Sequence, residues 1–231
     1  MKRFWTQATP VLQDGKYQVL LDHRPVKLPS GAALAVPFAP LAEGIAQEWG
    51  AAGAIFSPHD LPLTQFVCTA QERVEQHRLE IIRQLVAYGL NDLLCYRADT
   101  PPRLVALQQE NWGPWLRWLE TTHDIALITT HGLMPVAQLP WTEAKLTALL
   151  TPRSAYQLAA LGVLVPALGS FVLGLAVADG QISPEQACKA AMLDELWQAE
   201  QWGEDPETTA KRQTLLTELE HATRFLQLLA A

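Results

Sequence analysis

A stretch of 25 residues without a charged side chain, 154–178 (SAYQLAALGVLVPALGSFVLGLAVA), limits more than any other feature what this chain can fold into. A helix that is apolar all round belongs either in the centre of a globular core or in a lipid bilayer. Its glycines and Pro166 are tolerated better in membranes than in soluble helices. However, no Lys/Arg cluster follows it, and no aromatic belt flanks both ends. We expect a buried core helix over 152–178, kinked at Pro166, with a membrane helix as the alternative.

The composition of the whole chain is globular, with 49% hydrophobic and 18% charged residues. A disordered chain would have fewer hydrophobic and more charged residues. The net charge of −7 leaves no excess of Lys and Arg to neutralise phosphates. We therefore expect no nucleic-acid partner and no binding to an anionic membrane surface.

Cysteine and histidine usage gives no sign of a cofactor. Cys68, Cys95 and Cys188 lie far apart without a CxxC pair, which indicates free buried thiols in a reducing compartment. The six histidines form no HxxxH or HExxH pair, and no phosphate-binding glycine motif or GxSxG occurs. We expect no metal, no cofactor and no enzymatic activity.

The N-terminal sequence MKRFWTQATP has no apolar signal region and no Arg/Ser-rich presequence. We therefore expect a cytoplasmic protein, or a protein of the mitochondrial matrix if a presequence has been removed.

The first forty residues favour β-structure. Asp14-Gly15 lies between two alternating segments, which is the signal of a short hairpin, and Asp22-His23 indicates a second turn. A helix is predicted over 39–49. Two short strands, 125–129 and 134–137, are predicted to interrupt the later helices and to join the N-terminal sheet.

From Leu63 onward the helical period of apolar residues dominates. Thr64 is a candidate cap of a helix over 65–88, and Gly89 is a candidate stop. Ser183 followed by Pro184, with Gln186 three residues after the serine, fits a capping box. Further helices are predicted near 101–122, 141–150, 152–178, 184–202 and 206–229. The predicted fold class is α+β, with a small N-terminal α+β domain of antiparallel strands (1–98) and a C-terminal all-α multihelical domain (99–231).

Acidic and aromatic residues crowd together in the segment 192–205 (MLDELWQAEQWGED). On a helix, Ala190, Leu193 and Trp197 share a face that we expect to be core. Carboxylates near a helix C-terminus oppose the helix dipole, and a costly arrangement is sometimes kept for function. We predict that residues of this segment form a partner-binding surface together with one tryptophan from the N-terminal part of the chain. Its predicted residues are Asp194, Glu195, Gln198, Glu200, Trp202, Gly203, Glu204 and Trp49.

Two other interpretations of this segment remain open. Charged runs usually face water, so it is also explained as a solvated acidic corner whose tryptophan packs the helix junction. Alternatively, Asp194 with Glu195 or Glu200 would form a general acid/base pair, which requires a concave pocket around the two carboxylates. Trp49, at the end of its predicted helix, is equally compatible with packing and with partner contact.

Several segments together resemble the assembly-chaperone family for the α subunit of F1-ATPase. They occur in the family's order and spacing along nearly the whole chain. The matching segments are Leu21-Asp22-His23-Arg24-Pro25-Val26-Lys27, Glu48-Trp49, Pro62-Leu63-Thr64, Asp92-Leu93-Leu94-Cys95-Tyr96-Arg97, Trp112-Gly113-Pro114 and Glu195-Leu196-Trp197-Gln198 with Trp202-Gly203.

The resemblance implies a non-enzymatic chaperone for assembly of the ATP synthase F1 sector, without cofactor. It implies binding of the free α subunit, which is shielded from aggregation until the α3β3 ring forms. The family's Glu-x-x-Gln-x-x-x-Trp-Gly motif falls on Glu195, Gln198, Trp202 and Gly203. Since the family is soluble, the apolar segment is expected to be a buried central helix and the protein a monomer. A single-span membrane-associated scaffold is the alternative from the residues alone.

Overall fold

The computed structural model describes residues 1–132, 134–203 and 205–230, which divide into two compact units. The first unit contains Met1–Arg78, Ala155–Ala160 and the chain from His221 onward. The second contains Leu79–Ser154 and Leu161–Glu220. Each unit is built from segments that are distant in sequence, because residues 155–160 and 221–230 pack with the N-terminal residues. The domain boundary predicted at 98/99 concerns independent folding and stays a prediction.

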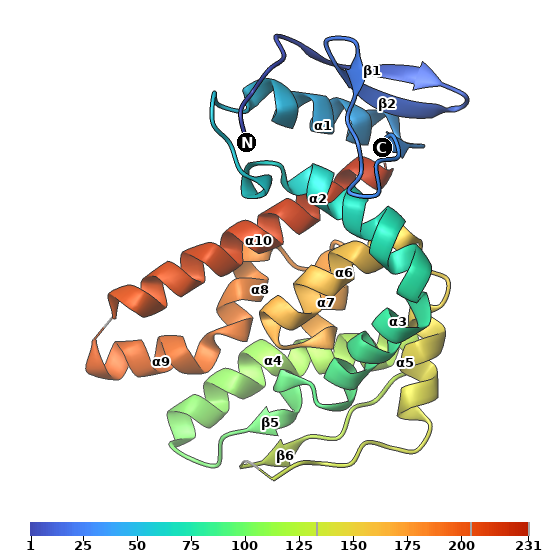
Figure 1. Cartoon of the computed structure of the whole chain (residues 1–231). Coiled ribbons are helices and arrows are strands. Elements are labelled where there is room, and N and C mark those ends of the chain that lie inside the picture. The colour runs from blue at the N-terminus through green and yellow to red at the C-terminus, as the bar shows by residue number, and fades with distance from the viewer. Residues whose placement is uncertain (133, 204, 231) are drawn as a thin grey trace. The chain divides into compact units, whose positions relative to one another are not determined.

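The first unit begins with a hairpin of β1 (Ala8–Gln13) and β2 (Lys16–Leu21), joined by the predicted two-residue turn (Figure 1). Asp14 and Gly15 have φ values of 51° and 77°, as a tight hairpin turn with right-handed strand twist requires. β3 (Arg24–Pro25) and β4 (Ala35–Val36) both pair with β2. The expected antiparallel N-terminal strands are therefore confirmed.

The longest edge strand of this sheet is β1, and Pro10 lies in the middle of it. Gln13 pairs with Lys16 across the turn, so alternate residues of β1 bond toward β2. The others, Pro10 and Leu12 among them, direct their backbone groups to the free edge. Because proline has no N–H, this position cannot donate to an added strand.

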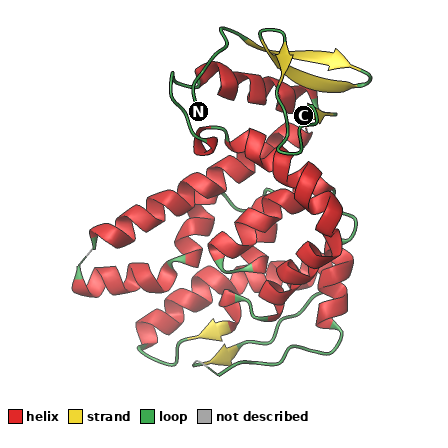
Figure 2. Cartoon of the chain, viewed as in Figure 1, coloured by secondary structure: helices red, strands yellow, loops and turns green. Residues whose placement is uncertain are grey.

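α1 (Ala39–Ala51) packs against the hairpin in the first unit (Figures 1 and 2). Val19 of β2 is fully buried, as are Leu41 and Ile45 one turn apart on α1. The alternation of buried residues along β2 and the helical spacing along α1 therefore form one apolar layer.

After α1 come η1 (Pro58–Asp60), α2 (Pro62–Cys68), a π-helix η2 (Thr69–Val74) and α3 (Glu75–Leu90). The prediction of one regular helix over 65–88 is wrong in its interior, which holds the π-turn and non-helical dihedrals at His77. The predicted stop, Gly89, lies inside α3. A β-carbon at Gly89 would come within 2.7 Å of Leu146 Cδ1, so this glycine serves close packing instead.

The second unit is mainly helical, and its sheet is a pair of two-residue strands. β5 (Tyr96–Arg97) pairs in parallel with β6 (Thr130–His131), so the prediction that strands 125–129 and 134–137 join the N-terminal sheet is wrong among the residues described. The remaining elements, some of which extend into the first unit, are η3 (Leu93–Cys95), α4 (Pro102–His123), α5 (Thr142–Leu150), α6 (Ala155–Leu168), α7 (Phe171–Ala178), α8 (Pro184–Ala191), α9 (Leu193–Trp202) and α10 (Pro206–Ala230).

The uncharged segment is buried as expected, but it forms two helices, α6 and α7, instead of one. Pro166 lies within α6, and the break falls at Gly169, whose φ is +61°. Ser170 then caps α7 by accepting a hydrogen bond of 3.1 Å from the Leu173 amide. Neither helix, nor any other helix among the described residues, is both long and apolar enough to cross a membrane.

The predicted helix over 184–202 is also divided, into α8 and α9, at Met192. The capping box of Ser183 and Gln186 is present at the start of α8, as predicted. An N-terminal part with antiparallel strands followed by a multihelical part confirms the α+β fold class.

Candidate functional site

α9, which carries most of the predicted partner-binding residues, is anchored at its first turn by Asp194. The Asp194 carboxylate is half-buried and accepts a hydrogen bond of 2.8 Å from the amide of Gln108 on α4. Gln108 is 1% exposed, and its oxygen accepts a bond of 2.8 Å from the backbone N–H of Ala98. The hydrogen bond between Asp194 and Gln108 therefore holds the first turn of α9 against α4.

A buried cation continues this network beneath α9. The guanidinium of Arg97 donates to the Gln108 carbonyl at 2.7 Å and lies 5.1 Å from the ring centre of Trp112. The indole of Trp112 in turn donates to the Ala190 carbonyl on α8 at 2.7 Å. Burial lowers the pKa of Arg97, while the negative charge of Asp194 acts in the opposite direction. α8 and the start of α9 are thus fastened to α4 by polar bonds as well as by packing.

The other predicted residues of α9 face water. Glu195 and Gln198 are exposed, and Trp202 is 77% exposed. The Trp202 ring meets Trp197 edge-on at 6.3 Å, which leaves most of its apolar surface uncovered. We call Glu195, Gln198 and Trp202 the α9 surface. It combines a large aromatic side chain with polar neighbours, which is the composition of a binding hot spot.

The last predicted residues lie at the end of α9. Glu200 pairs with Arg103 of α4 at 3.4 Å, and both side chains are well exposed. Gly203 ends the helix with a φ of +98°, a backbone conformation that favours glycine. Glu204 lies outside the described residues.

The structure gives the three carboxylates of the acid/base interpretation different surroundings. Asp194 is bonded to Gln108, Glu200 lies against Arg103, and Glu195 is exposed. The predicted core face behaves as expected for Ala190 and Leu193, which are buried. Sequence periodicity separated the buried face of α9 from its exposed face, but it gave no sign of the Gln108 anchor, because Gln108 lies on another helix.

Trp49 packs against other aromatic side chains in the first unit. Its ring centre lies 5.1 Å from that of Trp5 and 5.8 Å from that of Phe56, and its indole N–H donates to Thr64 Oγ1 at 3.0 Å. The side chain is half-buried. A contribution of Trp49 to partner binding stays a prediction.

The neighbouring Glu48 has a role that sequence reasoning missed, since it caps a helix 15 residues away. Its two carboxylate oxygens accept hydrogen bonds from the backbone amides of Leu63 at 2.6 Å and Thr64 at 3.1 Å. These are orphan N–H groups at the start of α2, so Glu48 caps that helix in place of the predicted Thr64. Burial raises the pKa of Glu48, and the two amides oppose that rise.

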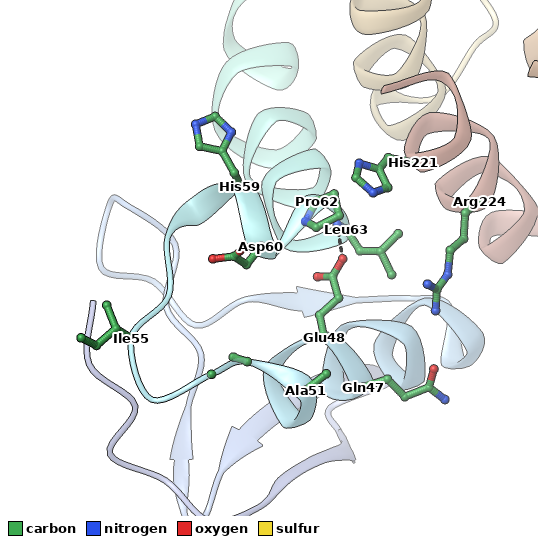
Figure 3. Close-up of a pocket in the computed structure, with 12 residues that line it drawn as sticks. Gln47, Glu48, Ala51, Ile55, His59, Asp60, Pro62, Leu63, His221 and Arg224 are labelled. Atoms are coloured by element: carbon green, nitrogen blue, oxygen red, sulfur yellow. Dashed lines mark hydrogen bonds between the residues drawn. The ribbon is translucent and has the colours of Figure 1, made fainter. Parts of the chain in front are cut away.

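Glu48 also lines a pocket of about 510 Å³ in the first unit (Figure 3). The pocket is bordered by the end of α1, by η1 with the start of α2, and by α10. In Figure 3, His221 and Arg224 of α10 lie on one side and Ile55 on the other, with Glu48 between them. No local pattern indicated this pocket, because its residues come from two distant parts of the chain, 47–63 and 221–224.

Comparison with known proteins places the chain in a family. Residues 2–120, just over half of the chain, match the model of the ATP12 chaperone protein family. "Protein atp12, mitochondrial" of Schizosaccharomyces pombe is 28% identical over 215 residues, which cover 87% of this chain and 74% of that protein.

Two solved structures have the same fold along the whole chain. Atp12 from Paracoccus denitrificans superposes with a TM-score of 0.93 at 38% identity, covering 98% of this chain and 97% of that one. The Atu1473 protein of Agrobacterium tumefaciens gives a TM-score of 0.93 at 33% identity, covering 99% of this chain and 86% of that one. The chain therefore belongs to the ATP12 chaperone family, which confirms the family of ATP synthase assembly chaperones expected from its motifs.

Proposed function

We propose that this protein binds the free α subunit of the ATP synthase F1 sector through the α9 surface and protects it from aggregation until the α3β3 ring forms. The observation that carries the proposal is Trp202, a tryptophan left 77% exposed at the end of a helix that is itself firmly anchored. Membership of the ATP12 family and the motif of Glu195, Gln198 and Trp202 support the choice of client.

The chemistry of the α9 surface suits a partner that is held and later released. Trp202 offers a large apolar contact at low entropic cost, and Glu195 offers a carboxylate to a cation of the client. A small surface of this kind gives modest affinity, because the costs of association consume much of the interaction energy. Modest affinity lets the β subunit displace the chaperone when the ring assembles.

The direct test is co-purification of the α subunit with the tagged chaperone from cells that produce both. Glu195→Lys and Trp202→Ala should each reduce the retained α subunit by about tenfold, the usual effect of losing a hot-spot contact. Glu120→Lys and Trp141→Ala are matched controls, since both residues are exposed in the second unit and lie outside the α9 surface. Equal retention by all four variants would move the client site elsewhere.

We further propose that the protein acts as a monomer in the cytoplasm. The proline on the open edge of β1 supports a monomer, because it opposes pairing between two copies through their sheets. Sedimentation or light scattering in detergent-free buffer should give a mass near 25.6 kDa. A concentration-independent dimer would contradict this proposal without touching the choice of client.

A further inference from the structure

The pocket of Figure 3 has two carboxylates on its wall, and both are already occupied as helix caps. Glu48 accepts the two amide bonds at the start of α2 and a third bond, of 3.2 Å, from Thr64 Oγ1. Asp60 accepts bonds from the Ser57 amide at 2.7 Å and the Ser57 hydroxyl at 3.1 Å. A cation entering the pocket would have to compete with the helix ends for these oxygens, so the carboxylates are poorly available to a ligand.

The hydrogen-bond donors on the same wall are available. The Arg224 guanidinium carries five N–H donors and a permanent charge, and it makes no hydrogen bond with a described residue, while its charge acts to lower the pKa of Glu48. The rings of His221, one turn earlier on α10, and of His59 on η1 also make no hydrogen bond within the described chain. The pocket therefore offers unpaired hydrogen-bond donors, those of Arg224 foremost, and a carboxylate is the acceptor that best matches a guanidinium.

The side of the pocket away from α10 carries an aliphatic side chain. Ile55 is 78% exposed there, and Asp60, whose carboxylate is bonded to Ser57, lies between it and Glu48 (Figure 3). A pocket of this volume falls within the range that accepts a specific ligand group. A group with a carboxylate at one end and an aliphatic part at the other would match both sides at once.

We infer that this pocket binds an acidic side chain of the client, with its carboxylate on Arg224 and a neighbouring aliphatic residue of the client against Ile55. The assignment rests on the proposed function, because it takes the F1 α subunit as the occupant. It adds a second contact, in the first unit, to the one made by the α9 surface. Charge complementarity selects the occupant, since Arg224 carries the permanent positive charge among the residues that line the pocket and makes no hydrogen bond with a described residue.

The test measures the α subunit that co-purifies with chaperone variants, each first shown by thermal unfolding to be folded. Arg224→Glu should lower the retained α subunit by about tenfold or more, because it replaces a charge-assisted contact with a repulsion. Arg73→Glu is the matched control, since Arg73 is an exposed arginine of the same unit that does not line the pocket. Arg224→Gln removes the charge without introducing repulsion and should give an intermediate loss.

The aliphatic side is tested separately. Ile55→Ser should lower retention several-fold, whereas Leu79→Ser, at a similarly exposed position (71%), should not. A photo-crosslinking amino acid, p-benzoylphenylalanine, in place of Ile55 should then attach to one segment of the α subunit that contains Asp or Glu beside an aliphatic residue. Replacing that acid with Arg in the client should restore retention by the Arg224→Glu chaperone.

The possible failures are distinct. If the wild-type chaperone retains the α subunit and Arg224→Glu retains it equally well, the pocket assignment is wrong and the proposed function stands. Equal losses in Arg224→Glu and Arg73→Glu, or crosslinks to a segment without an acidic side chain, also overturn the assignment. If the wild-type chaperone retains no α subunit, the proposed function fails and the assignment fails with it.

Discussion

The hydroxyl of Ser170 donates a hydrogen bond of 2.8 Å to the carboxylate of Asp92, a residue 78 positions earlier in the chain. The same carboxylate accepts bonds of 2.9 Å from the Leu94 and Val172 amides, so it caps both η3 and α7. The uncharged segment can therefore break in the middle of a core, because an acidic side chain from elsewhere satisfies the backbone groups that the break leaves free.

Asp92→Asn should destabilise the protein by about 1–3 kcal/mol, since the amide nitrogen cannot accept a hydrogen bond and leaves a buried donor unsatisfied. Urea unfolding at neutral pH measures this free energy. Ser170→Ala removes two bonds, the one that the hydroxyl donates to Asp92 and the one that it accepts from the Leu173 amide, so a loss of about 0.5–2 kcal/mol is expected. Equal stability of Asp92→Asn and wild type would show that the cap contributes nothing.

The same residue gives a pH dependence of known sign. Burial raises the pKa of Asp92 to about 6, above the ordinary value of 3.8 that applies in the unfolded chain. Between these values the folded protein holds the proton more tightly, so this group stabilises the fold at low pH and the contribution is lost as pH rises through about 6. The difference in unfolding free energy between wild type and Asp92→Asn should therefore be larger near pH 5 than near pH 7. A constant difference would contradict the prediction.

The three cysteines should react slowly in the folded protein. Burial raises the pKa of Cys95 to about 12 and that of Cys68 to about 11, and it also raises that of Cys188. Because the thiolate is the reactive form, alkylation by iodoacetamide near pH 8 should be slow until urea is added. Mass spectrometry of timed samples measures the rates, and rapid native labelling of Cys95 would contradict the structure.

A buried and an exposed tryptophan should contribute very differently to the free energy of unfolding. Trp112 is 1% exposed, so Trp112→Ala should cost about 3–5 kcal/mol of unfolding free energy. Trp202 is 77% exposed, and Trp202→Ala should change that free energy by no more than about 0.5 kcal/mol. Chemical unfolding of both variants makes the comparison. A large loss in Trp202→Ala would mean that any effect on client retention reflects folding.

Two glycines of the uncharged segment should respond in opposite directions. A β-carbon at Gly162 meets nothing within 4 Å, so Gly162→Ala should stabilise α6 by about 0.5–1 kcal/mol. At Gly174 it would lie 2.6 Å from Val165 Cγ2 and 3.1 Å from the Val165 backbone, so Gly174→Ala should cost about 1–3 kcal/mol. Thermal or urea unfolding of the pair measures both changes, and equal effects would contradict the tight contact of α6 with α7.

Local patterns predicted the parts of this fold that local chemistry determines. The Asp14-Gly15 turn and the capping box at Ser183 depend on residues within four positions of one another, and both are present as predicted. The break at Gly169 was not predicted, because its stabilising partner, Asp92, is distant in sequence. Thr64 has the chemistry of a cap, yet Glu48 takes that role through a contact that no periodicity contains.

The same limit applies to the candidate site. Helical periodicity placed Leu193 inside and left Glu195 and Trp202 outside, and the structure agrees. It gave no sign that a buried glutamine of another helix holds the Asp194 carboxylate in place, and the contribution of Asp194 to partner binding stays a prediction. The pocket beside Glu48 required the meeting of α1, η1 and α10, which only the folded chain reveals.

The position of Pro10 matters beyond the sheet itself. Under the proposed function, the protein contacts an unassembled client whose exposed strands could pair with an open edge of its own sheet. With a ring in place of an N–H at the centre of its outermost strand, this hairpin interrupts the ladder of bonds by which such strands would extend it. Under the proposed function, the chaperone can therefore contact its client repeatedly without its own sheet being extended by strands of that client.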